Sequence, residues 1–168
     1  MEIWDLYDEN RNKTGKDCIR GEEIPEDCYH LVVHIWIKNK KGEFLISQRA
    51  EDRKQNPLKW ECVGGSILKD EESLQGAIRE VKEEVGIDLN ENDGTLVLTK
   101  VRKQYCGKKY NDILDVWLYE YNGEVDLKNA TTKEVNQVKW MNKDEIKKLY
   151  DNKELVQTLG YFFEEIDI

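Results

Sequence analysis

Residues 64–87 read GGSILKDEESLQGAIREVKEEVGI, and this stretch carries the pattern that indicates the fold of the chain. Its apolar residues recur at i, i+4, i+7 and i+11, which is the period of one face of an amphipathic helix. Gly86 supplies the left-handed cap that ends such a helix. The pattern predicts a helix over residues 70–85, with an apolar stripe made of Leu74, Ile78, Val81 and Val85.

Three acids of this predicted helix, Glu80, Glu83 and Glu84, share one exposed face. At about 100° per residue they span roughly 100° of arc, well away from the apolar stripe. Like charges three and four residues apart weaken a helix by about 0.2–0.5 kcal/mol per pair. The ordinary explanation is a solvated acidic face. The alternative is a divalent cation, because carboxylate oxygens are the ligands that Mg²⁺ and Mn²⁺ accept.

The residues around these acids favour the cation. Gly65 is followed after five residues by Glu71, and after seven more by the run Arg79-Glu80-Val81-Lys82-Glu83-Glu84-Val85-Gly86-Ile87. This spacing resembles the Nudix box at every fixed position, with a chance probability of about 10⁻⁹ per starting residue. The box covers residues 65–87, and a looser resemblance extends over residues 29–150. It implies an α+β fold, an α/β/α sandwich with a mixed central β-sheet.

The resemblance also implies an activity: hydrolysis of a diphosphate linkage in a nucleoside diphosphate joined to another group. In that family a bound Mg²⁺ or Mn²⁺ neutralises phosphate oxygens and activates the attacking water. Arg79 matches the arginine that holds the acids in place through ion pairs, with Glu71 or Glu83 as its partner. By the same match the metal ligands are Glu80, Glu83, Glu84 and the backbone carbonyl of Gly64, which requires a tight loop at the two glycines.

Further candidates for the site lie outside the box. Arg49 follows a predicted strand and is placed either to bind substrate phosphate or to lie on the surface. Trp60 either stacks on a base or closes the core. The family often uses an extra acid as a base or an additional ligand. Asp112, Asp115 and Glu134 are the candidates here, and we favour Asp112 and Glu134 as catalytic residues.

A second resemblance concerns the isopentenyl-diphosphate isomerase branch of the same superfamily. It rests on residues 30–37, on Gln48-Arg49-Ala50 and on Trp60. The match makes His30 a metal ligand, and the alternative is a histidine hydrogen-bonded within a strand. That isomerase requires a cysteine followed by Gly-His-Pro, where this chain has Cys62-Val63-Gly64-Gly65. Protonating an alkene needs an acid held against the substrate carbon, and the sequence does not visibly supply one. Isomerisation is therefore the alternative function and not the first. A Nudix module that binds a ligand without turnover is a third hypothesis.

The chain has 168 residues, enough for one domain, and we predict a single domain over residues 1–168. Residues 1–28 form an N-terminal extension that begins with a β-hairpin, since residues 2–7 are β-prone and residues 8–15 indicate a turn. The core spans residues 29–150 and a C-terminal helix lies within residues 151–168. The predicted strands of the core are 30–38, 43–48, 95–101, 113–121 and 138–140, and a capping box at Asn142 and Glu145 opens a helix to residue 150. The last helix covers residues 155–163.

Charge and composition limit the partners. Lys+Arg 26 against Asp+Glu 35 leaves a net charge of −9, which disfavours nucleic-acid binding because that needs a basic surface. No apolar run approaches the ~20 residues of a membrane span, and the N-terminus lacks an export signal, so we expect a cytoplasmic protein without a membrane partner. The four cysteines, at 18, 28, 62 and 106, form no C-x-x-C pair and are interpreted as packing residues. The expected partner is a small diphosphate compound, and a homodimer through the N-terminal hairpin is a further hypothesis.

Overall fold

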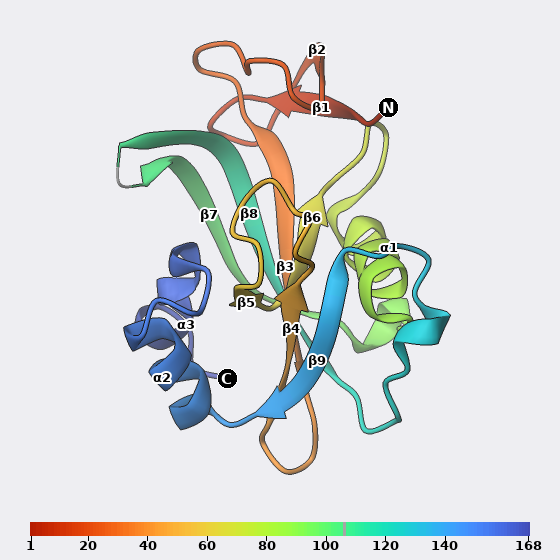
Figure 1. The fold of residues 1–168 in the computed structure, drawn as a ribbon. Helices are drawn as coiled ribbons and strands as arrows, with labels where there is room; N and C mark the ends of the chain where they lie inside the picture. Colours follow the sequence, from red (N-terminus) through yellow and green to blue (C-terminus); the bar gives the residue numbers. More distant parts are fainter. Residues whose placement is uncertain (106) are drawn as a thin grey trace.

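The computed structural model describes residues 1–105 and 107–168. At its centre is a mixed sheet in the order β5-β4-β3-β8-β7, with β6 paired to β3 and β9 paired to β4 (Figure 1). A separate antiparallel hairpin, β1 (Ile3–Tyr7) and β2 (Lys13–Ile19), forms the N-terminal extension. The strands of the main sheet are β3 (His30–Lys38), β4 (Phe44–Arg49), β5 (Trp60–Glu61), β6 (Val63–Ser66), β7 (Thr95–Tyr105), β8 (Lys108–Glu120) and β9 (Val135–Met141).

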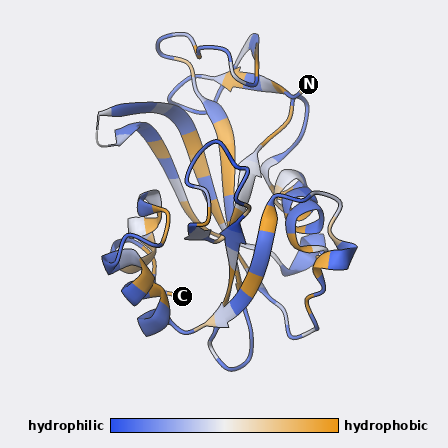
Figure 2. Ribbon diagram, viewed as in Figure 1, coloured by the Kyte–Doolittle hydropathy of each residue, from blue (hydrophilic) through white to orange (hydrophobic). Residues whose placement is uncertain are grey.

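Helices cover both faces of the sheet, as the α/β/α prediction requires (Figure 1). One face carries α1 (Ser73–Val85), and the other carries α2 (Lys143–Asp151) and α3 (Tyr161–Glu164). Alternation along β8 sends Ile113 into the apolar cluster under α1 and Leu114 into the cluster under α2 and α3. Short 3₁₀ turns are η1 (Glu91–Asp93), η2 (Leu127–Asn129) and η3 (Gln157–Gly160). Figure 2 shows hydrophobic residues along the middle of β3, which is covered on both faces.

The central helix α1 forms where the periodicity predicts it, but it begins three residues later. Asp70 has φ 63°, a left-handed turn that a helix cannot include. Gly86 has φ 74° and donates its backbone N–H to the Lys82 carbonyl, so it is the expected cap. Val81 and Val85 are fully buried, and Leu74 and Ile78 pack against the same cluster from its margin, so the predicted stripe is confirmed.

The C-terminal segment differs from the single helix expected over residues 155–163. Leu155 forms a parallel bridge with Trp60, and the Val156 N–H donates to the Trp60 carbonyl at 2.8 Å. This extended pairing beside β5 prevents a helix from starting at residue 155. The chain instead makes η3, then the single turn α3. Strands β7, β8 and β9 are longer than predicted, whereas β1, β3, β4 and α2 lie where expected. The turn of the hairpin is shorter than the predicted residues 8–15, because β2 already begins at Lys13, which pairs with Tyr7.

The cysteine expectation holds for the three cysteines that the structure describes. Cys18, Cys28 and Cys62 are free thiols and all are buried. Cys106 lies outside the described residues. In the described part of the chain, every helix is too short or too polar to cross a bilayer.

Candidate active site

The acidic face of α1 is directed toward β6 and not toward solvent, which corrects the exposed face expected from the sequence. Glu84 is 6% exposed, and the side chain of Glu80 is 13% exposed. Glu83 remains the most open of the three, with its side chain 37% exposed. A Cβ built at Gly65 would lie 2.1 Å from Glu80 Oε1. Glycine is needed at position 65 because the Glu80 carboxylate occupies the space of a side chain.

The two glycines do not form the tight loop expected from the sequence. Both lie in β6, where Gly64 pairs with His34 and Gly65 pairs with Val33 of β3. A Cβ at Gly64 would lie 2.6 Å from the Val33 carbonyl oxygen and 2.9 Å from His34 Cδ2. The glycines are therefore required for close packing on the two faces of one strand, Gly64 toward His34 and Gly65 toward Glu80.

Arg79 holds three acids of the box together. Its Nε and Nη2 donate to Glu71 at 2.7 and 2.9 Å. Its Nη1 donates to Glu80 at 3.0 Å and to Glu83 at 3.1 Å. Nη2 also donates to the Ser66 carbonyl at 3.0 Å, which fixes the guanidinium against β6. Both partners named from the sequence, Glu71 and Glu83, are present, and Glu80 is a third.

Two further acids face this cluster from other elements. Glu61 of β5 accepts a hydrogen bond from Arg49 Nη1 at 2.6 Å, and Glu134 pairs with Arg53 at 2.9 Å. Both carboxylates are close enough to raise the pKa of Glu84. Glu134 was a candidate from the sequence, whereas Glu61 and Arg53 were not. The sequence feature that could have identified Glu61 is its place in the short run Trp60-Glu61-Cys62-Val63, directly before the two glycines.

The pKa shifts show how crowded these acids are. Burial raises the pKa of Glu80 to about 7, and the charges of Glu83 and Glu134 add to the effect, while Arg79 opposes it. Burial also raises the pKa of Glu84 well above its usual value, and among the charged neighbours Glu61 adds most to the effect. For Glu71 burial alone would raise the pKa, but the hydrogen bonds from Arg79 bring it below the usual value. The cluster holds more negative charge than its arginines compensate.

This donor set fits a hard divalent cation. All its side-chain donors are carboxylate oxygens, and Glu84 Oε2 is buried without a hydrogen-bond partner in residues 1–105 and 107–168. Within those residues no group of three or more acidic, histidine or cysteine side chains is arranged to hold a metal ion as the side chains stand. In this arrangement the carboxylates pair with arginines instead: Arg79 with Glu80 and Glu83, and Arg49 with Glu61.

The structure does not bring Asp112 to the glutamates, and we correct its assignment to that site. Asp112 shares the face of β8 with Leu114, which is the face opposite α1. Both of its oxygens accept hydrogen bonds from Arg102, at 2.7 Å each. Asp115 does point to the α1 side, but its oxygens are bound by Arg11 and Ser73 and it is 1% exposed.

The remaining sequence candidates divide between the site and the core. Arg49 joins the site through Glu61. Trp60 closes the core, since it is 8% exposed and packs in the cluster under α2 and α3, with Lys139 Nζ 5.2 Å from its ring. His30 stacks on Trp4 with ring centroids 4.3 Å apart, and burial lowers its pKa to about 4.

Comparison with known proteins agrees with this geometry. A family model of the NUDIX domain matches residues 29–162. The chain belongs to the Nudix family. An uncharacterised Nudix hydrolase from Listeria innocua is 37% identical over 164 residues, covering 97% of this chain and 91% of that protein. The Nudix fold also agrees with a crystal structure from Deinococcus radiodurans, at a TM-score of 0.73 and 16% identity over 92% of both chains.

Family membership identifies the chain as a Nudix hydrolase, and such enzymes generally use divalent cations such as Mg²⁺ or Mn²⁺. The resemblance to the isomerase branch has partial support as well. An isopentenyl-diphosphate Delta-isomerase from Photorhabdus laumondii is 32% identical over 108 residues, which is 62% of this chain and 60% of that protein.

Proposed function

We propose that this Nudix hydrolase cleaves a diphosphate linkage in a nucleoside diphosphate joined to another group, with Mg²⁺ or Mn²⁺ as its cofactor. The observation that carries the proposal is the contact of Glu80 with Gly65 and Arg79, beside the buried carboxylate of Glu84. Burying carboxylates is costly unless positive charge compensates them. A divalent cation supplies that charge and also suits a diphosphate substrate.

Each residue has a proposed role. Glu80, Glu83, Glu84 and the Gly64 carbonyl hold the metal, which when bound neutralises phosphate oxygens and lowers the pKa of a coordinated water. Arg79 positions the acids through its hydrogen bonds.

Two residues outside the box complete the proposed machinery. Glu134 is the general base, since it lies near enough to Glu80 and Glu84 to raise the pKa of both. Arg49 orients the substrate phosphate, because its guanidinium sits at the edge of the acid cluster and a planar guanidinium binds phosphate in a forked geometry. Both roles place these side chains in the catalytic and binding machinery.

The test is a pooled screen of diphosphate compounds with Mg²⁺ and with Mn²⁺, in which products are identified by mass. Glu83→Gln should lower turnover by about 10²–10³-fold while thermal unfolding changes little, because the Glu83 side chain is half-open to solvent. Glu124→Gln, at an exposed residue outside the site, is the matched control. Normal turnover in Glu83→Gln would remove the helix acids from the mechanism.

Isomerisation of a prenyl diphosphate is the alternative, because of the partial match to an isomerase. Cys62 does not supply the required acid: it is 2% exposed, and burial raises the pKa of its thiol. Incubation with isopentenyl diphosphate separates the two reactions. Phosphate release indicates hydrolysis, and an intact diphosphate with a moved double bond indicates isomerisation. A module that binds without turnover would give neither product with any compound of the screen.

A further inference from the structure

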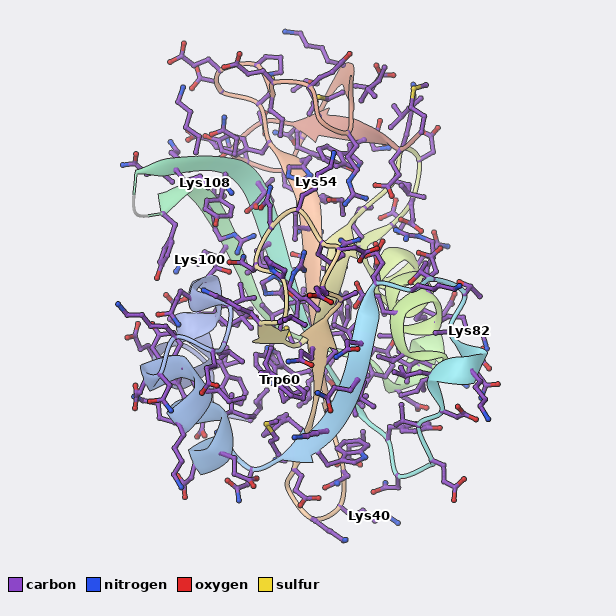
Figure 3. All side chains as sticks on the ribbon, viewed as in Figure 1. Lys40, Lys54, Trp60, Lys82, Lys100 and Lys108 are labelled. Carbon is purple, nitrogen blue, oxygen red and sulfur yellow. The ribbon has the colours of Figure 1, made fainter. Side chains whose placement is uncertain are left out.

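The segment after the turn η2, residues 130–134, packs against the C-terminal end of α1 and carries the proposed general base as its last residue. A Cβ built at Gly86 would lie 2.7 Å from the backbone carbon of Asn129 and 2.8 Å from the backbone nitrogen of Ala130. Gly86 is therefore required for two reasons: its φ is positive, and the chain passes where a side chain would lie. Figure 3 labels Lys82 in the last turn of the helix that this segment contacts.

The backbone carbonyl of Glu83 anchors the segment. It accepts hydrogen bonds from the backbone N–H groups of Thr131 and Thr132, each at 3.0 Å, and from the Thr132 hydroxyl, also at 3.0 Å. Carbonyl groups in the last turn of a helix have no partner within that helix, and α1 ends at Val85. The segment therefore binds a carbonyl that the helix itself leaves open.

The Thr132 hydroxyl is a third donor to this carbonyl and is not needed to satisfy it. A carbonyl oxygen has two lone pairs, and the two backbone N–H groups are sufficient for them. Removing the hydroxyl leaves the carbonyl paired, so the loss of stability should be small. The hydroxyl does allow a short contact, because Oγ1 lies 3.0 Å from the carbonyl oxygen. A methyl carbon stays about 3.3–3.6 Å from such an oxygen, so it would push the segment outward by about 0.3–0.6 Å.

Glu134 is held on its other side by the chain that follows β4. Its carbonyl accepts a hydrogen bond from the Ala50 N–H at 2.8 Å, and its carboxylate pairs with Arg53 at 2.9 Å. A single residue, the exposed Lys133, separates Glu134 from the anchored Thr132. One residue spans at most about 3.6 Å, so there is little slack between the anchor and the acid. A shift at Thr132 is therefore transmitted to Glu134.

Glu83 thus contacts both parts of the proposed machinery. Its carboxylate is a proposed metal ligand and accepts a hydrogen bond from Arg79 at 3.1 Å, while its carbonyl holds the segment of the proposed base. A general base must lie within about 2.6–3.2 Å of the group from which it takes a proton. A backbone contact to the ligand residue itself keeps the base and the ligand at a fixed separation.

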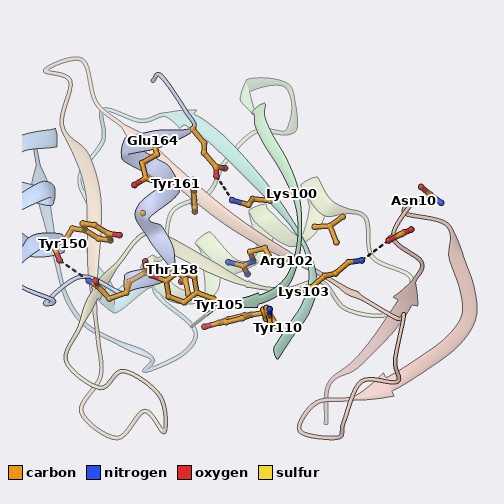
Figure 4. A pocket seen from close by; sticks show the side chains of 16 residues that line it. Asn10, Lys100, Arg102, Lys103, Tyr105, Tyr110, Tyr150, Thr158, Tyr161 and Glu164 are labelled. Carbon is orange, nitrogen blue, oxygen red and sulfur yellow. Dashed lines mark hydrogen bonds and ion pairs between the residues drawn. The ribbon is translucent and has the colours of Figure 1, made fainter. Parts of the chain in front are cut away.

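The cavity beside β7 is a separate feature of the molecule. Figure 4 shows it between β7 and the C-terminal elements, and none of residues 127–134 lines it. A substitution at Thr132 leaves the wall of that cavity unchanged. A loss of activity in such a variant is therefore not explained by a change of the cavity.

We propose that Thr132 is a positioning residue of this hydrolase: its hydroxyl, bound to the Glu83 carbonyl, sets the distance between the acids of α1 and Glu134. The inference rests on the proposed hydrolysis and on the role of Glu134 in it. Thr132 acts through Glu134 and does not touch the substrate. Gly86 takes part as well, because a glycine at that position lets the segment reach the carbonyl.

The test compares Thr132→Val, which replaces the hydroxyl by a methyl group, with Thr132→Ser, which keeps the hydroxyl. We expect Thr132→Val to lower kcat by about five- to tenfold with KM nearly unchanged, and Thr132→Ser to keep kcat within about twofold of the native value. Thr131→Val is the matched control, because in residues 1–105 and 107–168 the Thr131 hydroxyl has no hydrogen-bond partner. Thermal unfolding checks that the three variants fold.

Two further measurements separate positioning from a general loss of structure. In the Glu134→Gln background, Thr132→Val should change kcat by less than about twofold, because two residues that act through one group are not additive. Calorimetric titration with Mn²⁺ should give Thr132→Val the native affinity, since the carboxylates of α1 are untouched.

Three results would overturn the role of Thr132 and leave the hydrolase standing. They are a native kcat in Thr132→Val, an equal loss in the native and Glu134→Gln backgrounds, and Mn²⁺ binding weakened by about tenfold, which would place the effect at Glu83. Full activity of Glu134→Gln refutes the base and this inference together. A native protein that hydrolyses no compound of the screen refutes the proposed function itself, and the inference with it.

Discussion

The carboxylate of Glu80 occupies the space in which a side chain at position 65 would lie, with Oε1 2.1 Å from the position of a Cβ on Gly65. The helix α1 and the strand β6 approach this closely only because position 65 has no side chain. The contact fixes the Glu80 carboxylate, which also accepts from Arg79 at 3.0 Å. The glycine that opens the box therefore sets the position of an acid fifteen residues later.

Gly65→Ala should displace the Glu80 carboxylate and lower kcat by about 10²-fold, because a misplacement of about 1 Å is this costly in catalysis. The fold should remain, since Gly65 has an ordinary strand conformation and φ is not positive. Gly123→Ala is the control, because its Cβ meets only the end of the Tyr121 side chain. Activity assays and unfolding curves of both variants check this, and a fully active Gly65→Ala contradicts it.

Arg79→Lys should lose most of the activity although the charge is kept. A lysine has one ammonium group and cannot contact Glu71, Glu80, Glu83 and the Ser66 carbonyl together as the guanidinium does. We expect kcat to fall by about 10²-fold and the free energy of unfolding by about 1.5–3 kcal/mol, the value of charged hydrogen bonds. Steady-state kinetics and urea unfolding measure both, and an unchanged kcat would show that Arg79 is not a positioning residue.

Glu84→Gln should lower the activity of the enzyme without lowering its stability. Glu84 is almost completely buried and one of its oxygens has no partner within the described residues. Removing a buried charge relieves a desolvation cost, so in metal-free buffer the variant should be as stable as the native protein or more stable by about 1–2 kcal/mol. Its turnover should fall by about 10²-fold or more, because a metal ligand is lost. A large loss of stability would show that the carboxylate is well compensated in the free protein.

The ion pair between Arg11 and the buried Asp115 should make the stability of the fold depend on pH. Burial alone would raise the pKa of Asp115, but hydrogen bonds from Arg11, Ser73 and Thr99 lower it. Because the folded pKa lies below the unfolded value of about 3.9, the stabilisation is complete above that value and is lost as pH falls through the folded pKa.

Arg11→Ala should therefore cost about 1.5–3 kcal/mol of unfolding free energy near neutral pH, and progressively less as pH falls below the unfolded pKa and through the folded pKa of Asp115. Tryptophan fluorescence during urea unfolding at several pH values measures this. The control is Arg20→Ala, because Arg20 and Glu2 form an exposed pair that is worth less than about 1 kcal/mol. A loss for Arg11→Ala that is the same at all pH values would contradict the assignment to Asp115.

Glu134→Gln and Asp112→Asn test which acid outside the box takes part in the chemistry. Glu134 faces Glu80 and Glu84, so Glu134→Gln should lower kcat by about 10–10²-fold. Asp112 binds Arg102 on the other face of the sheet, away from the glutamates, so Asp112→Asn should leave kcat nearly unchanged. Kinetics of the two variants under identical conditions decide, and a larger kcat effect in Asp112→Asn reverses the assignment.

Local pattern made much of this protein predictable. The period of Leu74, Val81 and Val85, with Gly86 after them, determines an amphipathic helix, because these contacts are only a few residues apart in the chain. The same holds for the N-terminal hairpin and the strand of residues 30–38. Arg79 and the three glutamates were identified from the spacing of the Nudix box, which is a property of the sequence alone.

Tertiary structure decided which of these groups meet. Glu61 and Glu134 join the glutamates of α1 because β4 pairs with both β5 and β9, a contact between segments far apart in sequence. Asp112 falls on the opposite face because β8 pairs in parallel with β3 in a register that aligns it with His30. The helix expected after residue 155 is interrupted because Leu155 pairs with Trp60. Sequence determined the local elements and the chemical types of the site, whereas strand pairing over long separations determined burial, neighbours and charge balance.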